Sequence, residues 1–420
     1  MNHTDSVAIK QENIVQMIAA TLNLIDTRLV THGERVALLA HELVLADASL
    51  QDIDMDTLFL LCEFHDIGAY KTEEIDQMVV FENQNIWNHS IYGYLFLKNL
   101  TPLHERALPI LYHHQRYDML QNTAMPDIRY AAILALADRV DLCLMSGATD
   151  AQIEERLLAD AGRFAPDLVA LFLKVNKTRH FAQLIAGDAP YQFAYHYAAK
   201  LSVTPQEAVQ YLQMLVYSVD FRSEHTVTHT INTTAISLEL AKRCHLSEYT
   251  QKTIELGALL HDLGKVAIPL SILEYPGRLS PDDMKIMRTH VVYTEQLLKG
   301  RVDDEIMQIA IRHHEKLDGT GYAYGLFGDV LSVPQRIVAV ADIVSALGSR
   351  RSYKEPFPKE KTLELVGELA KAGKLDAQIC ALVAHDFDAI MRATDMARDP
   401  VIAAYRDIHT EYERILQLVM

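Results

Sequence analysis

Histidines and aspartates recur in the same order at two places in this 420-residue chain. Each set has a single histidine, a His-Asp pair, another histidine, a His-His pair and a late aspartate, and the second set follows the first by about 200 residues. The first set is His32, His65, Asp66, His89, His113, His114 and Asp138. The second set is His229, His261, Asp262, His290, His313, His314 and Asp342. Because the spacing is kept at every anchor, we predict a duplicated metal-binding unit.

Chance accounts for some of these neighbours, since the chain has 19 histidines. His385-Asp386 is such a case, because no other residue of ligand type accompanies it at the repeat spacing. We interpret it as a surface or capping pair. A lone histidine is more often a buried ring bonded to a backbone carbonyl than a ligand, whereas the two full sets favour ligation.

The residue types indicate the chemistry. Imidazole and carboxylate ligands without thiolates suit iron, manganese or zinc, and a carboxylate can bridge two ions where an imidazole cannot. Each set has more ligands than one tetrahedral site needs, which indicates at least two ions. In paired sites the ions lie roughly 3.5–4 Å apart and turn a water into a nucleophile at neutral pH. Phosphoester hydrolysis is the natural reaction of such a centre.

The composition limits the function classes. Half of the residues are apolar and the net charge is −17, so we expect sizeable cores and no broad surface for a nucleic-acid polymer. The four cysteines form no C-x-x-C pair, which favours a reducing compartment. Neither a basic leader nor an apolar stretch of membrane-spanning length is found. We therefore expect a cytoplasmic protein without a membrane partner.

The elements that position the ligands are expected to be helices. Glycine and proline are sparse, and alternating Val/Thr-rich segments are nearly absent. Ser280 is expected to cap a helix that continues to Gly300. Residues 303–315 are expected to form a buried helix that the tandem histidines close. The His261-Asp262 pair is expected to end an apolar helix over residues 254–260.

The second half of the chain resembles the HD superfamily of metal-dependent phosphohydrolases, and within it the HD-GYP subfamily that linearises cyclic dinucleotides. The similar stretch covers about residues 225–355 and contains HDLGKVAIPLSILEYPGRLS, HHEKLDGTGYAYGL and RIVAVADIVSAL. The resemblance implies an all-α fold in which the second set ligates metal and Asp262 bridges the ions. It implies that Asp262 and Lys265 are catalytic. It also implies substrate contacts by Lys265, Asp318, Gly321, Tyr322 and Arg351.

Two positions depart from the subfamily pattern. Ala323 replaces the proline of the Gly-Tyr-Pro signature, which gives the loop more freedom in φ and leaves its substrate selection open. His225 stands where members with a third metal carry a glutamate. We therefore expect two divalent ions, with iron or manganese favoured over zinc, nickel, cobalt and magnesium.

The first set keeps the ligands and loses other parts. Ala69 stands where the second set has Lys265, and no Gly-x-Gly-Tyr loop follows His114. We expect that metal can bind to the first set without efficient turnover. Lys71, two positions later, is an alternative source of the missing cation.

The segment Gly187–Pro205 separates the two sets and is too apolar for a free linker. We place the boundary near residue 200. The prediction is therefore two tandem HD-type domains packed together. Residues 1–200 would form a degenerate domain with a regulatory or structural role, and residues 201–420 the catalytic domain.

The tandem arrangement looks most like the HD-GYP-type phosphodiesterases that act on 3′3′-cyclic GMP-AMP. Cyclic di-GMP is the main alternative, because no residue visibly distinguishes one purine from the other. Two further classes stay open: an HD-fold di-iron oxygenase, whose turnover would depend on oxygen, and a non-catalytic nucleotide-binding regulator. The expected partners are the cyclic dinucleotide and the neighbouring domain of the same chain, and a homodimer is left open.

Overall fold

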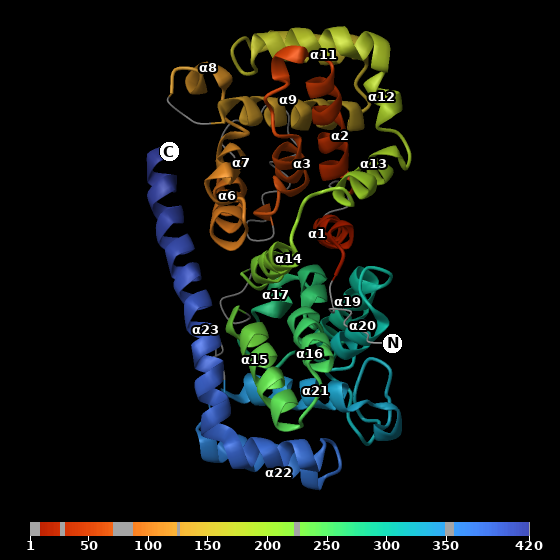
Figure 1. The fold of residues 1–420 in the computed structure, drawn as a ribbon, viewed down its shortest axis with the longest axis vertical. Helices are drawn as coiled ribbons and strands as arrows, with labels where there is room; N and C mark the ends of the chain where they lie inside the picture. Colours follow the sequence, from red (N-terminus) through yellow and green to blue (C-terminus); the bar gives the residue numbers. More distant parts are fainter. Residues whose placement is uncertain are drawn as a thin grey trace. The chain divides into compact units, whose positions relative to one another are not determined.

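The computed structural model describes residues 9–25, 30–69, 87–123, 127–221, 227–348 and 357–419. Across these ranges the regular secondary structure is helical (Figure 1), and an isolated bridge of strand type joins Asp318 to Phe327. The all-α prediction is confirmed. None of the described helices combines the length and the apolar character that crossing a bilayer demands.

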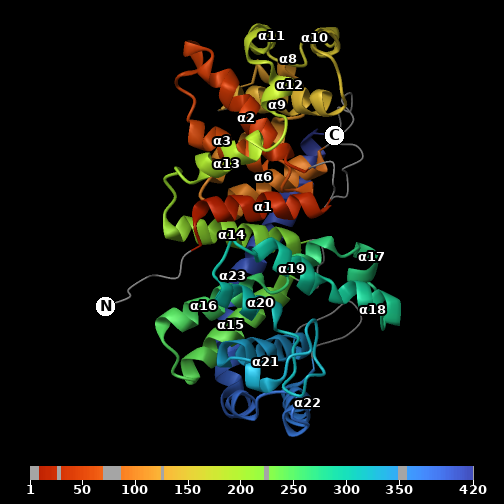
Figure 2. The ribbon, with the colours of Figure 1, turned by 90° about the vertical axis from the view of Figure 1, so that its right-hand side faces the viewer.

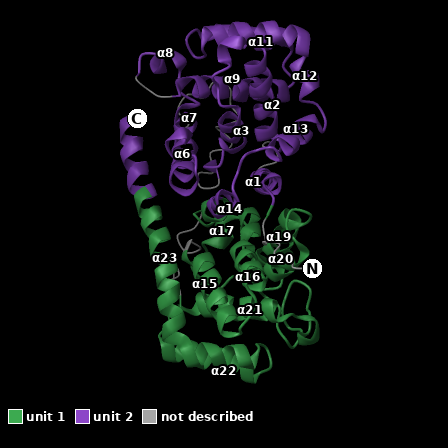
Figure 3. Cartoon of the chain, viewed as in Figure 1, with its two compact units in different colours: residues 1–9, 215–407 green, residues 10–214, 408–420 purple. Residues whose placement is uncertain are grey.

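The chain divides into two compact units, drawn in different colours in Figure 3. The C-terminal unit, in green, is built on Leu215–Asp407. The N-terminal unit, in purple, comprises Lys10–Met214 together with Ile408–Met420. Helices α14 (Pro205–Asp220) and α23 (Ala377–Val419) contribute residues to both units. The boundary expected near residue 200 lies between α13 and α14.

In the N-terminal unit, α2 packs on α3, α9 and α13, and α6 packs on α7. Large side chains such as Phe64, Phe96 and Leu43 are fully buried in this bundle. The elements are α1 (Gln11–Ile25), α2 (His32–Leu45), η2 (Ala48–Leu50), α3 (Met55–Phe64), α6 (Asn88–Leu100), η3 (His104–Ala107), α7 (Leu108–Tyr112), α8 (Tyr117–Leu120), α9 (Ile128–Met145), α10 (Asp150–Ala159), α11 (Pro166–Arg179), α12 (Phe181–Leu184) and α13 (Ala189–Ala198).

In the C-terminal unit, α15 packs on α16 and α21, α16 packs on α20, and α19 packs on the short turn η4. Aliphatic side chains of these helices, among them Ile236, Ile254 and Val338, form one buried core with Val366 and Val383. The elements are α15 (Val227–Arg243), α16 (Glu248–Leu260), η4 (Leu263–Ala267), α17 (Leu270–Leu273), α18 (Pro281–Arg288), α19 (His290–Leu298), α20 (Asp304–Ile311), η5 (Gly328–Val330), α21 (Val333–Gly348) and α22 (Lys359–Lys371).

Corresponding helices of the two units make corresponding contacts. Helices α2 and α15 carry the first histidine of each set, α3 and α16 end at the His-Asp pair, and α9 and α21 carry the late aspartate. Contacts join α2 to α3, α2 to α9 and α7 to α9 in the N-terminal unit. In the C-terminal unit they join α15 to α16, α15 to α21 and α20 to α21. The repeat in the sequence is therefore also a repeat in helix packing.

The prediction of a single helix from residue 281 to Gly300 is wrong, because α18 and α19 are separate helices (Figure 2). Thr289 interrupts the helix. Its N–H and its hydroxyl both donate to the carbonyl of Ile286, at 3.0 and 2.6 Å. These bonds close the last turn of α18, and His290 becomes the first residue of α19.

Three helix ends can be compared with their predictions. Ser280 caps α18 as predicted, since its Oγ accepts the N–H of Asp283 at 3.1 Å. Helix α16 ends immediately before His261, also as predicted. Helix α20 ends at Ile311, so the expectation that the tandem histidines close it is wrong. Arg312 leaves the helical conformation at φ −109° and ψ 7°, and the histidines lie in the turns that follow.

Candidate metal centre

The residues of the second set converge in the C-terminal unit, where most of them are buried. Their positions are α15 for His229, the end of α16 for His261 and Asp262, the start of α19 for His290, the turns after α20 for His313 and His314, and α21 for Asp342.

Three imidazoles of this cluster turn their Nε2 atoms to its centre. The Nδ1 atoms of His261, His290 and His313 donate to backbone carbonyls three residues earlier, at 2.7, 2.7 and 2.6 Å. Because a carbonyl oxygen only accepts, Nδ1 carries a proton in each ring, and Nε2 is the nitrogen that can offer a lone pair to a metal. Burial lowers the pKa of His290 to about 3 and holds the pKa of His313 well below its ordinary value. Both rings are therefore neutral at physiological pH.

The carboxylate of Asp262 divides the cluster into two groups. Its Oδ2 lies 3.1 Å from Nε2 of His261 and 3.6 Å from Nε2 of His229. Its Oδ1 lies 3.4 Å from Nε2 of His290 and 3.8 Å from Nε2 of His313. Oδ1 is buried and accepts no hydrogen bond from the described residues. A carboxylate with one oxygen toward each group has the geometry of a bridging ligand.

The facing rings test whether the cluster fits metal. Nε2 of His261 lies 3.4 Å from Nε2 of His229, and Nε2 of His290 lies 3.5 Å from Nε2 of His313. Lone pairs at this distance repel unless a cation or a proton lies between them. The ligand atoms of His229, His261 and Asp262 all lie within 4.8 Å of one another, and so do those of His290, His313 and His314. Each group can therefore hold a metal ion.

Asp342 and Ser345 orient the first histidine of the set. Oδ1 of Asp342 lies 3.1 Å from Nε2 of His229, and its Oδ2 lies 3.3 Å from Nδ1 of His314. The Ser345 hydroxyl donates to the backbone carbonyl of His229 at 3.2 Å, and its oxygen lies 3.0 Å from Nδ1 of that histidine. The hydroxyl oxygen therefore accepts the Nδ1 proton, and Nε2 of His229 faces the carboxylates with its lone pair.

Lys265 adds a cation to the cluster from the turn η4. Its Nζ donates to Oδ2 of Asp262 at 2.5 Å, and its side chain is 18% exposed. Burial alone would raise the pKa of Asp262, but the neighbouring charges of His261 and Lys265 hold that pKa well below its ordinary value. The carboxylate is thus ionised, and the ammonium group lies between it and the surface.

A glycine in each unit brings the His-Asp turn against the next helix. A Cβ on Gly264 would lie 2.0 Å from the carbonyl oxygen of His290, and a Cβ on Gly68 would lie 2.0 Å from that of His89. No side chain is tolerated at such distances. The two glycines therefore set the separation between the His-Asp pair and the following histidine in both units.

The loop after the tandem histidines is held by Glu315, which the sequence did not single out. Its carboxylate accepts the N–H groups of Tyr324 and Leu326 at 2.8 and 2.9 Å. A Cβ on Gly321 would lie 2.4 Å from Cα of Glu315. Gly321 thus allows the loop to fold back onto the histidine turn, and its predicted contact with substrate stays a prediction.

Tyr322 carries this loop into contact with the cluster. Its ring centroid lies 4.5 Å from that of His314. Arg288, the last residue of α18, also contacts this ring. Its guanidinium lies 4.8 Å from the centroid of the Tyr322 ring. Arg288 is exposed, and the sequence offered only its position two residues before His290 as a signal.

Asp318 and Arg351 are the two other residues predicted to contact substrate. The carboxylate of Asp318 accepts both the N–H and the hydroxyl of Thr320, at 3.0 and 2.6 Å. It therefore stabilises its own turn, and a role in substrate binding stays a prediction. Arg351 lies outside the described residues.

The first set converges in the N-terminal unit. His32, His65 and Asp138 form one group of ligand atoms within 4.8 Å, and His89, His113 and His114 form another. Asp66 lies between them, with Oδ2 3.4 Å from Nε2 of His65 and Oδ1 3.8 Å from Nε2 of His89. The position that corresponds to Lys265 is occupied by the buried Ala69, and Lys71 lies outside the described residues.

The isolated pair His385-Asp386 lies at the surface. The His385 side chain is 83% exposed, and its Nδ1 lies 2.9 Å from Oδ1 of Asp386. Asp386 also accepts Nε of Arg243 at 2.9 Å and has non-helical φ/ψ within α23. These contacts agree with the interpretation of a surface pair.

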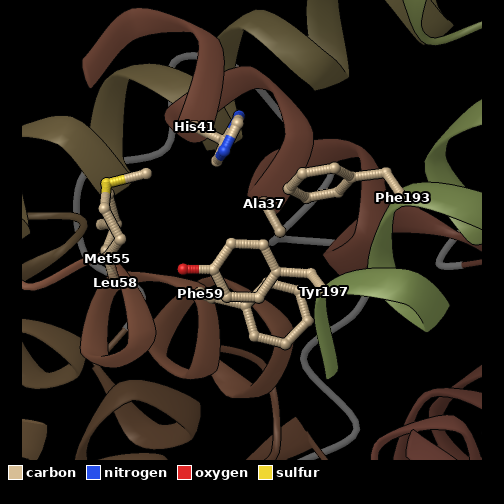
Figure 4. A pocket seen from close by; sticks show the side chains of 7 residues that line it. All are labelled: Ala37, His41, Met55, Leu58, Phe59, Phe193 and Tyr197. Atoms are coloured by element: carbon tan, nitrogen blue, oxygen red, sulfur yellow. The ribbon is translucent and has the colours of Figure 1, made fainter. Parts of the chain in front are cut away.

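A small aromatic pocket in the N-terminal unit shares no lining residue with either histidine cluster. His41, Phe59, Phe193 and Tyr197 form most of its wall (Figure 4). The rings of Phe59 and Tyr197 stack with centroids 4.5 Å apart, and the Tyr197 hydroxyl donates to Asp56 at 3.0 Å. The pocket is therefore a gap between packed side chains of α13, α2 and α3.

Both units of the chain are similar in sequence to known proteins. HD-domain family models match residues 29–143 and 210–379. The 3′3′-cGAMP-specific phosphodiesterase 1 of Vibrio cholerae is 28% identical over 403 residues, which is 89% of this chain and 90% of that protein. The cyclic di-GMP phosphodiesterase response regulator RpfG of Xanthomonas campestris is 34% identical over 46% of this chain and 50% of its own length.

The fold is also that of a solved structure. The crystal structure of a cyclic GMP-AMP specific phosphodiesterase of V. cholerae superposes with a TM-score of 0.57 at 19% identity, covering 91% of this chain and 98% of the other. The chain therefore contains two HD domains, one in each unit, and the prediction of tandem HD domains is confirmed.

Proposed function

We propose that the C-terminal unit is a metal-dependent phosphodiesterase that linearises a cyclic dinucleotide to a 5′-phosphorylated linear dinucleotide. The observation that carries this proposal is the Asp262 carboxylate, whose two oxygens face separate histidine groups while Lys265 donates to one of them. Charge develops on the phosphoryl oxygens when water attacks a phosphodiester, and cations placed in advance stabilise it.

The proposed cofactor is a pair of divalent cations, iron or manganese, held by the seven residues of the second set. When bound, such a pair acidifies a water for attack on phosphorus and neutralises negative charge. The backbone carbonyls behind His261, His290 and His313 hold the Nδ1 protons, so that the Nε2 atoms are the ones that would ligate the ions. Lys265 orients Asp262 and places a positive charge beside the position proposed for a phosphoryl oxygen.

The substrate would be held by side chains around the cluster. A cyclic dinucleotide has two phosphates, so a second cation is needed beyond the one at the reaction centre. The exposed guanidinium of Arg288 suits the second phosphate, and the Tyr322 ring beside His314 suits a base or ribose face.

We propose 3′3′-cyclic GMP-AMP as the preferred substrate. The relative named as specific for this dinucleotide aligns with both units, over 89% of the chain, whereas the cyclic di-GMP phosphodiesterase RpfG aligns with 46%. A match over both units supports the hybrid dinucleotide, and cyclic di-GMP is the alternative.

Purified full-length protein loaded with Mn²⁺ or Fe²⁺ tests the proposal. It is incubated separately with 3′3′-cyclic GMP-AMP, cyclic di-GMP and cyclic di-AMP, and products are identified by chromatography and mass spectrometry. We expect a 5′-phosphorylated linear dinucleotide, with the highest kcat/KM for the hybrid and the same rate without oxygen. No product from any of the three would refute the enzymatic proposal. Faster turnover of cyclic di-GMP would refute only the substrate preference, and oxygen-dependent turnover would favour the oxygenase class.

A further inference from the structure

A buried arginine enters the histidine cluster of the N-terminal unit. Arg139 follows Asp138 on α9 and is 1% exposed. Its Nη2 donates to Nδ1 of His114 at 2.6 Å, and its Nε lies 3.5 Å from Oδ2 of Asp138. The C-terminal unit has Ile343 at the corresponding position after Asp342. A cationic side chain directly after the late aspartate is therefore found in the N-terminal unit and not in the C-terminal unit.

The direction of this hydrogen bond determines where His114 carries its proton. A guanidinium has donors and no acceptor, so Nδ1 of His114 must accept and the ring proton must be on Nε2. Nε2 of His114 lies 3.0 Å from Nε2 of His89, to which it donates.

The group His89, His113 and His114 therefore offers a single available Nε2, although its distances alone would admit a cation. Nε2 of His114 is occupied by a proton, and the lone pair of His89 Nε2 accepts that proton's hydrogen bond. His113 alone keeps an available Nε2, since its Nδ1 donates to the carbonyl of Ile110 at 2.6 Å. One imidazole does not hold a divalent cation against water.

The other group of the N-terminal unit remains suited to metal. Oδ2 of Asp141 accepts Nδ1 of His32 at 2.7 Å, and Arg35 donates to both oxygens of Asp141, at 2.6 and 2.9 Å. This bond fixes the His32 ring so that Nε2 faces the cluster, 3.2 Å from Nε2 of His65 and 3.3 Å from Oδ1 of Asp138. The Nδ1 of His65 in turn donates to a backbone carbonyl. A carboxylate behind a ligating histidine is a common device for fixing its tautomer.

We infer that the N-terminal unit binds a single divalent cation through His32, His65, Asp66 and Asp138, and that the Arg139 guanidinium supplies the positive charge of the missing second ion. The ligand set of two imidazoles and two carboxylates suits manganese, iron or zinc. With one ion and with Ala69 in place of a lysine, this site stabilises the unit and does not cleave phosphodiesters. The inference concerns the N-terminal unit and does not depend on the activity proposed for the C-terminal unit.

Metal counting in the full-length chain tests the inference. The variant His261→Ala/Asp262→Ala/His290→Ala/His313→Ala removes ligands from both C-terminal groups and leaves the N-terminal site to be measured. After loading with Mn²⁺ and desalting, we expect one manganese per chain by mass spectrometry and the resolved hyperfine lines of an isolated Mn²⁺ ion in its electron paramagnetic resonance spectrum. Adding His32→Ala should reduce the content to none. Two coupled ions, or none, with Arg139 intact would overturn the inference.

Substitutions at Arg139 and His114 give independent tests in the same background. Arg139→Ile installs the residue of the other unit and should raise the content to two ions with a broadened, coupled spectrum. Arg139→Lys keeps the charge and should leave one ion. If Arg139→Ile fails to fold, His114→Ala still decides, because a non-ligating His114 predicts unchanged Mn²⁺ affinity. A fall of more than tenfold on that substitution, or a single ion in a folded Arg139→Ile chain, would refute the inference.

Discussion

Nζ of Lys265 and Oδ2 of Asp262 lie 2.5 Å apart in the C-terminal unit, at the carboxylate that faces both histidine groups. The N-terminal unit has the corresponding aspartate, Asp66, but the buried Ala69 at the lysine position. The difference between the units therefore lies in the cation beside the carboxylate as much as in the ligands.

Lys265→Met should lower kcat without removing metal. The ammonium touches the carboxylate and no histidine of the set in the described contacts, so the ligands keep their places. A donor that stabilises developing charge is worth roughly 10²–10³ in kcat. Metal content and steady-state rates are compared with those of Lys252→Met, in which the half-buried lysine on α16 that pairs with Glu255 is replaced. Full activity in the Lys265 variant would contradict the assigned role.

Asp262→Asn should lose metal and activity together. Each oxygen of Asp262 faces a different histidine group, and an amide replaces one of these oxygens with a donor. We expect kcat/KM to fall by at least about 10³, as for loss of a group on which the whole centre depends. The matched variant is Asp66→Asn in the N-terminal unit, which should keep the activity. If Asp66→Asn abolished turnover in a folded chain, the assignment of catalysis to the C-terminal unit would be wrong.

Gly264→Ala should destabilise the C-terminal unit and lower activity. The new methyl group would meet the carbonyl of His290 and the N–H of Thr294, at 2.0 and 2.5 Å, so the His-Asp turn must move away from α19. Overpacking of this kind costs about 1–3 kcal/mol, or more when backbone atoms are in the way. Chemical denaturation measures the loss.

Gly367→Ala on α22 serves as the control for Gly264→Ala. A Cβ there meets no atom within 4 Å, so alanine should stabilise the helix by about 0.8–1.0 kcal/mol through its better helix propensity. Equal effects of the two substitutions would argue against the close approach of the turn to α19.

Divalent cations should stabilise the folded chain. The Nε2 atoms of His261 and His229 face each other at 3.4 Å, and a bound ion would convert this repulsion into ligation. At a free Mn²⁺ concentration of 100 times Kd, a single site raises the free energy of unfolding by about 2.7 kcal/mol. Denaturation with Mn²⁺ and with a chelator measures the difference. His261→Ala should lose part of this response, and an undiminished response would show that the stabilising ion binds elsewhere.

Arg288→Ala should raise KM and leave the metal content unchanged. The guanidinium lies against the Tyr322 ring and is exposed, so it can reach a phosphate while it contacts no ligand of the set. Hydrogen bonds to charged groups contribute about 1.5–3 kcal/mol, which corresponds to a KM increase of roughly tenfold or more. Arg288→Lys keeps the charge and should recover part of the affinity. An unchanged KM in both variants would remove Arg288 from the substrate site.

The sequence predicted the helical class and the residues that come together in each cluster, because both follow from local rules. Ligand residues at fixed spacing, with a glycine after each His-Asp pair, describe the same turn in both units. The end of α16 before His261 follows from its apolar run, and the Ser280 cap follows from its side-chain chemistry.

Other features depend on how the helices are turned and could not be predicted. Arg139 reads as an ordinary arginine of α9, and only the packing of that helix directs its guanidinium to His114. Arg288 likewise meets the Tyr322 loop through the break at Thr289, where a continuous helix was expected. Arg351 is still a prediction from resemblance.

The last residues of α23 belong to the N-terminal unit, where Tyr412 stacks on Tyr92 at 4.2 Å and Glu411 pairs with Lys98 at 2.9 Å. This unit is thus formed by two stretches of the chain that are far apart in the sequence. A recombinant fragment that ends at Met214 would lack Tyr412, and the ring of Tyr92 would lose its stacking partner. Dissection of the protein therefore calls for supplying the terminal peptide in trans, or for a permuted chain that joins residues 408–419 to the N-terminal unit.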